Sequence, residues 1–233
     1  MGWECAYCGR SPSKKKNRQR DHVPPRCLFR RPFPDDLVTA PACSDCHKGT
    51  NLDDEYLRIV LTIREDVAGH PEADLERTHR ALEGPSRSLA RSLARLSEQI
   101  PVTSPGGIHH LAAIYQVDRP RLERVISRIT MGLFYNAQRC RLPEAYVVRA
   151  WTEPEWEKLT PRLRRLLAGK LFDRPAMEIG KGRRVFEFRA AFDTKDPSIS
   201  AWLFMIYGVV EFFSFTVRRD AELAQLARSR GIQ

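Results

Sequence analysis

The chain of 233 residues lacks a long, uninterrupted apolar run. Its most apolar stretch, AWLFMIYGVVEFFSFTV at 201–217, contains Glu211 and is rich in aromatic and β-branched side chains. A membrane-spanning helix needs about 20 apolar residues. The stretch therefore predicts two buried strands that turn near Tyr207–Gly208, with a membrane span as the alternative. We accordingly expect no membrane partner.

An apolar leader is also missing, because the first residues, MGWECAYCGR, are mixed in character. This favours a cytoplasmic location, where six cysteines indicate metal ligands or free thiols rather than disulfides. The sequence has no Gly-rich phosphate loop, nucleophile elbow, paired-carboxylate glycosidase pattern or internal repeat. These absences argue against the enzyme classes that depend on such motifs.

Acidic residues are scarce relative to basic ones, with 29 Asp and Glu against 39 Lys and Arg, a net charge of +10. The excess is concentrated in residues 1–34, which hold nine basic side chains against Glu4 and Asp21. Such a balance favours a polyanionic partner, and we expect nucleic acid, in particular DNA. A solvated basic loop is the alternative. We expect nine of the basic residues to contact nucleic acid. They leave out Arg10 and include Lys48, and are Lys14, Lys15, Lys16, Arg18, Arg20, Arg26, Arg30, Arg31 and Lys48.

Four cysteines form two Cys-x-x-Cys pairs, Cys5/Cys8 and Cys43/Cys46. A tight turn lets each pair present two thiolates, and two pairs complete a tetrahedral Zn²⁺ site with no open position. The spacing therefore predicts a structural zinc that staples a small N-terminal domain. Cys27 and Cys140 are unpaired and are interpreted as small packing residues.

The segment between the two cysteine pairs carries Asp21–His22, and His47 directly follows Cys46. A zinc ion that joins the pairs also brings these three side chains into one small volume. Neighbouring residues on a strand point in opposite directions, so one of Asp21 and His22 can bind a divalent cation while the other faces a substrate. His22 titrates near neutral pH and can take a proton from an attacking water. The alternatives are a turn cap or ion pair for Asp21, a buried histidine at 22 and a helix cap at 47.

The order Cys-x-x-Cys, Asp-His, Cys-x-x-Cys-His over residues 4–65 resembles the zinc-stapled HNH endonucleases, which have a ββα-metal core. The resemblance implies that Asp21 and His47 bind a catalytic divalent metal and that His22 is the general base. It implies hydrolysis of DNA phosphodiester bonds with Mg²⁺, or with Mn²⁺ or Ni²⁺. An Asn that many members carry before the second pair is replaced by Asp35 or Asp36 here.

The whole chain is expected to be α+β, in three parts. Residues 1–65 form the HNH nuclease domain with the zinc, including a helix over 53–64. Residues 66–138 form a helical segment, with helices over 71–98 broken at Gly84–Pro85, a break over 100–107 and amphipathic helices over 108–138. Residues 139–233 form a mixed α/β domain, with strands at AYVVRAW and RVFEFRAAF and a helix over 153–171.

Two functions outside catalysis remain open from the sequence. The zinc fold can bind nucleic acid without cutting it, or the C-terminal region can bind a protein partner while the zinc domain supports it. Other histidines are interpreted without a site: His109–His110 at a helix start, His70 in a solvated loop and His79 on a charged helix.

Overall fold

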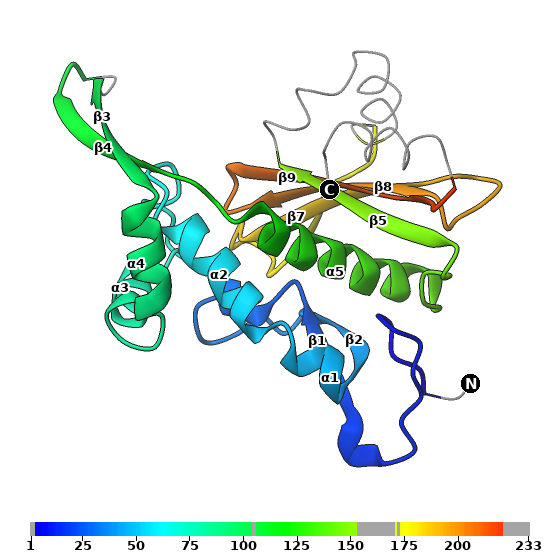
Figure 1. Cartoon of the computed structure of the whole chain (residues 1–233). Coiled ribbons are helices and arrows are strands. Elements are labelled where there is room, and N and C mark those ends of the chain that lie inside the picture. Colours follow the sequence, from blue (N-terminus) through cyan, green and yellow to red (C-terminus); the bar gives the residue numbers. More distant parts are fainter. Residues whose placement is uncertain (1–2, 104–105, 153–170, 172, 221–233) are drawn as a thin grey trace.

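The computed structural model describes residues 3–103, 106–152, 171 and 173–220. Its order of elements confirms the α+β class. Figure 1 shows the long helix α5 (Arg119–Gln138) lying between a five-stranded sheet and the N-terminal hairpin of β1 and β2. α5 contacts elements on both sides, so the N-terminal hairpin and helices and the C-terminal sheet both pack against it.

The N-terminal part is a hairpin followed by two helices. A short 3-10 turn, η1 (Lys15–Asn17), leads into β1 (Arg18–Val23), and η2 (Arg26–Leu28) follows it. β1 pairs antiparallel with β2 (Val38–Cys43), which places Asp21 opposite Ala40. α1 (Ser44–Lys48) and α2 (Asn51–Thr62) come next. The predicted helix over 53–64 is α2, begun two residues earlier.

The middle part differs from the prediction in its second half. α3 (Leu75–Glu83) and α4 (Arg87–Arg95) confirm the helices broken at Gly84–Pro85. β3 (Ser97–Thr103) and β4 (His109–Tyr115), however, pair as an antiparallel hairpin, so the expected helix over 108–115 is wrong. His109–His110 therefore begin a strand. Leu and Ala in that stretch favour a helix locally, and pairing with β3 outweighs this preference.

α5 begins where the sequence indicates an interruption, near Asp118–Pro120. The Asp118 carboxylate accepts a hydrogen bond from the Arg121 backbone N–H, and Pro120 fits the first turn because its missing N–H is not needed there.

The C-terminal part is an antiparallel sheet of β5 (Tyr146–Thr152), β6 (Met177–Ile179), β7 (Phe186–Phe192), β8 (Ser200–Ile206) and β9 (Val210–Arg218). The strand order is β5-β9-β8-β7-β6. β8 and β9 confirm the two buried strands, and Tyr207 and Gly208 turn between them with positive φ, as a tight hairpin requires. No helix among the described residues is long and apolar enough to cross a membrane. The helix expected over 153–171 lies outside the described residues, apart from Leu171.

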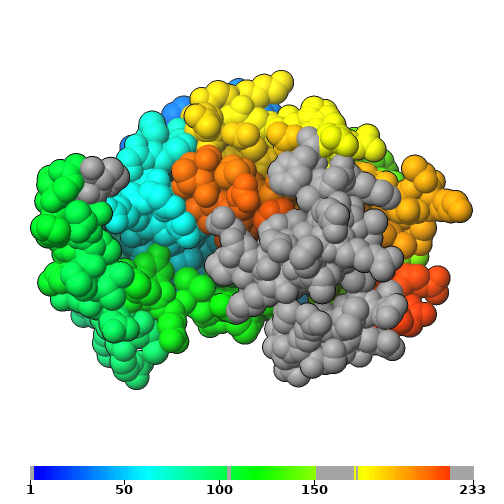
Figure 2. Space-filling model, turned by 90° about the horizontal axis from the view of Figure 1, so that it is seen from above, coloured from blue at the N-terminus to red at the C-terminus, as the bar shows by residue number. Residues whose placement is uncertain are grey.

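His70 lies at a contact between the five-stranded sheet and the N-terminal half of the molecule. Its ring lies 5.2 Å from the ring of Tyr207, between centroids, and Figure 2 shows the turn of β8 and β9 (orange) against the cyan segment after α2. Burial lowers the pKa of His70. His70 is therefore half-buried against the β8–β9 turn, and not solvated as expected. His79 is exposed, as predicted.

One hydrophobic cluster draws residues from all three predicted parts, among them Val23, Leu57, Ile126 and Trp202. α5 approaches β1 closely at Gly132, where an added Cβ would lie 2.5 Å from a methyl carbon of Val23. This close approach fixes α5 over the strand that carries Asp21.

Candidate metal centre and active site

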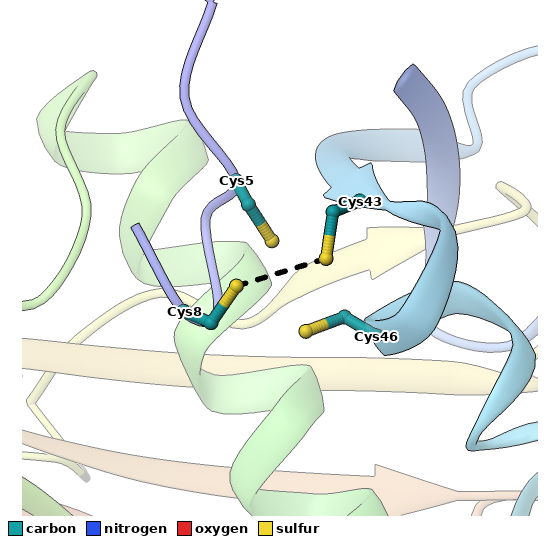
Figure 3. A group of neighbouring side chains, drawn as sticks. All are labelled: Cys5, Cys8, Cys43 and Cys46. Carbon is teal, nitrogen blue, oxygen red and sulfur yellow. Dashed lines mark hydrogen bonds between the residues drawn. The ribbon is translucent and has the colours of Figure 1, made fainter. Parts of the chain in front are cut away.

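The four cysteines of the two pairs converge on one point. Their sulfur atoms all lie within 4.8 Å of one another, and those of Cys8 and Cys43 are 3.7 Å apart (Figure 3). Thiolates bound to one tetrahedral zinc at about 2.3 Å are about 3.8 Å apart. The tetrad can therefore hold a structural zinc ion, as the spacing predicts.

Arg10 favours the metal-binding form of one thiol. Its guanidinium Nε donates to the Cys8 sulfur at 3.4 Å, and Arg10 also pairs with Asp45. Burial raises the pKa of Cys8, but hydrogen bonds from Arg10 outweigh it and lower this pKa to about 6. A thiolate, and not a thiol, is the zinc ligand.

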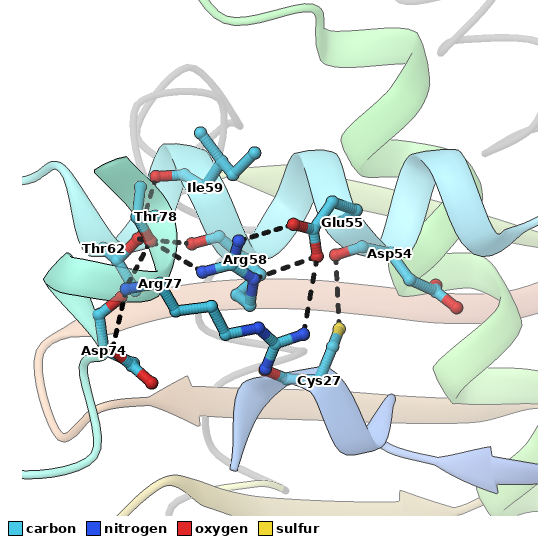
Figure 4. Close-up of polar contacts among 9 residues, drawn as sticks. All are labelled: Cys27, Asp54, Glu55, Arg58, Ile59, Thr62, Asp74, Arg77 and Thr78. Carbon is cyan, nitrogen blue, oxygen red and sulfur yellow. Dashed lines mark hydrogen bonds and ion pairs between the residues drawn. The ribbon is translucent and has the colours of Figure 1, made fainter. Parts of the chain in front are cut away.

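The two unpaired cysteines differ from each other. Cys27 donates to the backbone carbonyl of Asp54 at 3.5 Å, and burial raises its pKa to about 12 (Figure 4). This agrees with an inert packing residue. Cys140 is exposed, so its predicted packing role is wrong. Cys140 follows Arg139, the left-handed residue that ends α5.

Asp21, His22 and His47 line one cavity of about 430 Å³. The Nδ1 atom of His47 lies 3.4 Å from Oδ1 of Asp21. This nitrogen is buried and has no hydrogen-bond partner among the described residues. Two ligands in adjacent positions of an octahedral cation at about 2.1 Å lie about 3 Å apart. An imidazole nitrogen and a carboxylate oxygen are also suitable donors for Mg²⁺, Mn²⁺ or Ni²⁺, so the pair fits a divalent cation.

His22 is half-buried, whereas its two neighbours in β1, Asp21 and Val23, are buried. Burial, and then the positive charge of Arg26, lower the pKa of His22. The imidazole is therefore neutral at physiological pH, which is the state that can accept a proton.

Sequence reasoning missed Arg128 on α5. Its Nη2 atom donates to Oδ2 of Asp21 at 2.5 Å, and its guanidinium lies 5.0 Å above the ring of Tyr7. The Tyr7 hydroxyl donates to the same oxygen at 2.6 Å. Arg128 and Asp21 are both buried. These two hydrogen bonds orient the Asp21 carboxylate. Both end on Oδ2, and neither reaches Oδ1, the oxygen 3.4 Å from His47. No local signal marks Arg128, which is 107 residues from Asp21.

Asp54 of α2 is a second missed residue and lines the same cavity. Its Oδ2 is 3.8 Å from Nη1 of Arg128, while its buried Oδ1 has no hydrogen-bond partner in the described part of the chain. Figure 4 shows its carboxylate directed away from the polar cluster of Glu55 and Arg58. Burial raises the pKa of Asp54 to about 7, although Arg128 opposes this.

The predicted nucleic-acid contacts are spread over the N-terminal surface. Arg20 and Arg26 line the cavity with Asp21, and the other seven do not. Arg18 is half-buried, with its guanidinium 5.6 Å from the Trp3 ring, and Arg30 pairs with Asp74 at 3.5 Å. Seven members are exposed and form no ion pair within the described part of the chain: Lys14, Lys15, Lys16, Arg20, Arg26, Arg31 and Lys48.

The acidic residues in the place of the expected Asn do not reach the cavity. Oδ1 of Asp36 accepts a hydrogen bond from the Gly180 backbone N–H at 2.9 Å. Asp36 therefore ties the N-terminal loop to the end of β6 instead of holding the loop that carries His22.

Comparison with known proteins gives no relative for this chain: no family model matches it, and neither a curated protein nor a solved structure matches it significantly. The functional argument therefore depends on the residues and their geometry.

Proposed function

We propose that the protein is a metal-dependent endonuclease of the HNH type that hydrolyses phosphodiester bonds of DNA. The observation that carries this proposal is the proximity of Asp21 Oδ1 to a buried His47 nitrogen, in a cavity that His22 also lines. This nitrogen receives no hydrogen bond from any residue that the structure describes. The resemblance in motif order over residues 4–65 supports it.

Each of the three residues has a distinct role in this proposal. Asp21 and His47 hold a divalent cation, which when bound would stabilise negative charge on the phosphate and on the leaving oxygen. His22 takes the proton of the attacking water through its neutral imidazole. Arg20 and Arg26 hold backbone phosphates at the mouth of the cavity.

Arg128 is a positioning residue in this scheme, since it contacts Asp21 and not the reacting atoms. By taking Oδ2 of Asp21, it fixes the carboxylate with Oδ1 toward His47. The proposed nuclease site therefore needs α5 as well as the first 65 residues.

The test is plasmid nicking by zinc-loaded protein with Mg²⁺, Mn²⁺ or EDTA. We expect metal-dependent nicking that His22→Ala lowers by about 100-fold or more, the usual contribution of a general base. The control is His79→Ala, which removes an exposed imidazole on α3 and should nick like the parent protein. Equal rates for all three proteins, or no cutting of any DNA by the parent, would contradict the proposal.

One observation favours a second function, a zinc-stabilised module that binds nucleic acid without cutting it. Asp21 already has Arg128 and Tyr7 as partners, which is also the pattern of a purely structural carboxylate. Salt-dependent DNA binding, retained by His22→Ala and without any nicking by the parent, is the result expected for that module.

A further inference from the structure

Helix α4 presents a row of arginines along one side. Its sequence, RSLARSLAR, places Arg87, Arg91 and Arg95 four residues apart, and all three are exposed. A step of four residues turns an α-helix by only about 40°, so the three side chains follow one another along the same side of the helix. We call Arg87, Arg91 and Arg95 the arginine row.

The side of α4 that lies opposite the arginine row holds the helix to the protein. Leu93 is buried, and Leu89 packs against the main hydrophobic cluster. Each of these leucines is about half a turn away from the arginines, as the period of 3.6 residues requires. The leucines are therefore occupied within the fold, and the helix offers only its charged side to a partner.

The arginine row has little negative charge to balance it. α4 itself contains no acidic residue. The nearest ones in the sequence, Glu83 and Glu98, lie outside the helix and form no ion pair with the row within the described part of the chain. Arg87 donates to the backbone carbonyl of Glu83, at 2.7 Å from Nη2 and 3.1 Å from Nε. The side chains of Arg91 and Arg95 have neither an ion pair nor a hydrogen bond with any residue that the structure describes.

This arrangement is unfavourable for the helix by itself. Like charges four residues apart on a helix repel each other, and the row contains two such pairs. Arg87 also stands in the first turn, where a positive charge opposes the helix dipole, and Ser86 makes no side-chain cap that would compensate. An ordinary solvated helix face alternates the two signs of charge instead. An anion with several charges beside the row would remove this repulsion.

We infer that the arginine row binds the phosphate backbone of duplex DNA. The phosphates repeat along a strand, so a row of cations can contact several of them at once. A guanidinium donates two parallel hydrogen bonds to a phosphate group, and the row is made of arginine alone. A membrane-surface helix would instead insert its apolar side into lipid, and in α4 that side is occupied by the fold.

The arginine row is separate from the cavity of the proposed nuclease site. Asn51 and Asp54 line that cavity at the start of α2, whereas α3 meets the other end of α2, where the hydroxyls of Thr62 and Thr78 are 2.8 Å apart. These two ends are about 16 Å apart along the helix. Figure 1 shows α4 beside α3, away from α1 and the β1–β2 hairpin. The row shares the expected DNA partner with the proposed function, but its binding requires no hydrolysis.

The test is fluorescence anisotropy of a labelled DNA duplex, two helical turns long, with full-length, zinc-loaded His22→Ala protein over a range of salt concentrations. The row variant combines Arg87→Gln, Arg91→Gln and Arg95→Gln, because glutamine has a helix propensity close to that of arginine. We expect weaker binding by about 10-fold or more. We also expect the slope of log K against log salt to fall by about 2–3, since each phosphate contact contributes about 0.9. The midpoint of thermal unfolding should stay the same or rise, because the repulsion within α4 is removed.

The matched control loses the same charge elsewhere. It replaces three exposed basic residues outside α4 by glutamine, at Arg139, Arg174 and Lys195, and its slope should fall by less than about 1. An unchanged slope in the row variant, or equal slopes in the row and control variants, would overturn the inference. So would failure of the His22→Ala protein to bind the duplex. Binding that depends on the row, together with absent nicking by the parent, would contradict only the proposed hydrolysis.

Vesicles containing phosphatidylserine supply the competing partner. Leu111 and Ile114 of the neighbouring β3–β4 hairpin are exposed, so an anionic membrane is the alternative that this region of the surface offers. We expect the row variant and the control variant to bind vesicles alike. Vesicle binding that depends on the row, with duplex binding that does not, would overturn the inference in favour of lipid.

Discussion

Replacing Arg128 by methionine would remove a cation that lies within 4 Å of both Asp21 and Asp54 while keeping a side chain of similar length. The ion pair with Asp21 is buried on both sides, with 10% and 11% of the two side chains exposed. The substitution therefore leaves two largely buried carboxylates without this cation. Breaking a buried pair in this way costs about 3–5 kcal/mol. We expect a loss of that size in the free energy of unfolding.

The variant Arg128→Lys separates charge from geometry. Lysine keeps a positive charge but cannot reach Asp21 and Asp54 together as the forked guanidinium does, so we expect a smaller loss. A double-mutant cycle with Asp21→Asn should give a coupling energy of about 1 kcal/mol or more, since the two groups are in contact. The assay is urea unfolding of zinc-loaded protein near pH 8.

The reasoning would be refuted by a loss below about 1 kcal/mol for Arg128→Met, the range of an exposed pair. Strict additivity with Asp21→Asn would refute it too. For the proposed nuclease, Arg128→Lys should also raise the metal concentration that gives half-maximal nicking, because a less firmly held Asp21 binds the cation more weakly. A lower maximal rate at unchanged metal dependence would argue against a positioning role.

Three further predictions concern the zinc, Asp54 and the contact of α5 with β1. Cys46→Ser should reduce bound zinc well below one ion per chain and destabilise the N-terminal hairpin, as measured by metal analysis and thermal unfolding; full zinc content would contradict the tetrad. Asp54 has its pKa raised from 3.8 to about 7 in the folded protein, so its contribution to stability is complete below about pH 4 and is lost as the pH rises through about 7. Asp54→Asn should therefore gain stability relative to the parent between about pH 4 and pH 8, and a constant difference across that range would refute this. Gly132→Ala should destabilise the protein by about 1–3 kcal/mol in urea unfolding, because its Cβ would meet Val23; an unchanged midpoint would show that β1 can shift.

Several features of the protein follow from local sequence. Two Cys-x-x-Cys pairs determine the cysteine tetrad, because a tight turn is enough to bring the two sulfur atoms of each pair together. A zinc ion with tetrahedral coordination would then join the two pairs. The apolar stretch 201–217 determines β8, β9 and their turn, since its composition suits buried strands and Gly208 tolerates the positive φ. The spacing of Asp21, His22 and His47 from the cysteines is enough to bring them to one cavity.

Tertiary structure alone decides the rest of the candidate site. Arg128 belongs to a helix whose periodicity shows an ordinary buried face, and only its packing on β1 makes it the partner of Asp21. The hairpin at 97–115 is another case, because its residues favour helix or loop until β3 and β4 pair. A cavity of about 630 Å³ is a third case, because it depends on α1 and α2 meeting α5 and β5, which lie far apart in the chain. Long-range contacts of this kind leave no trace in local spacing, because their free energy arises from burial and charge that exist only in the folded protein.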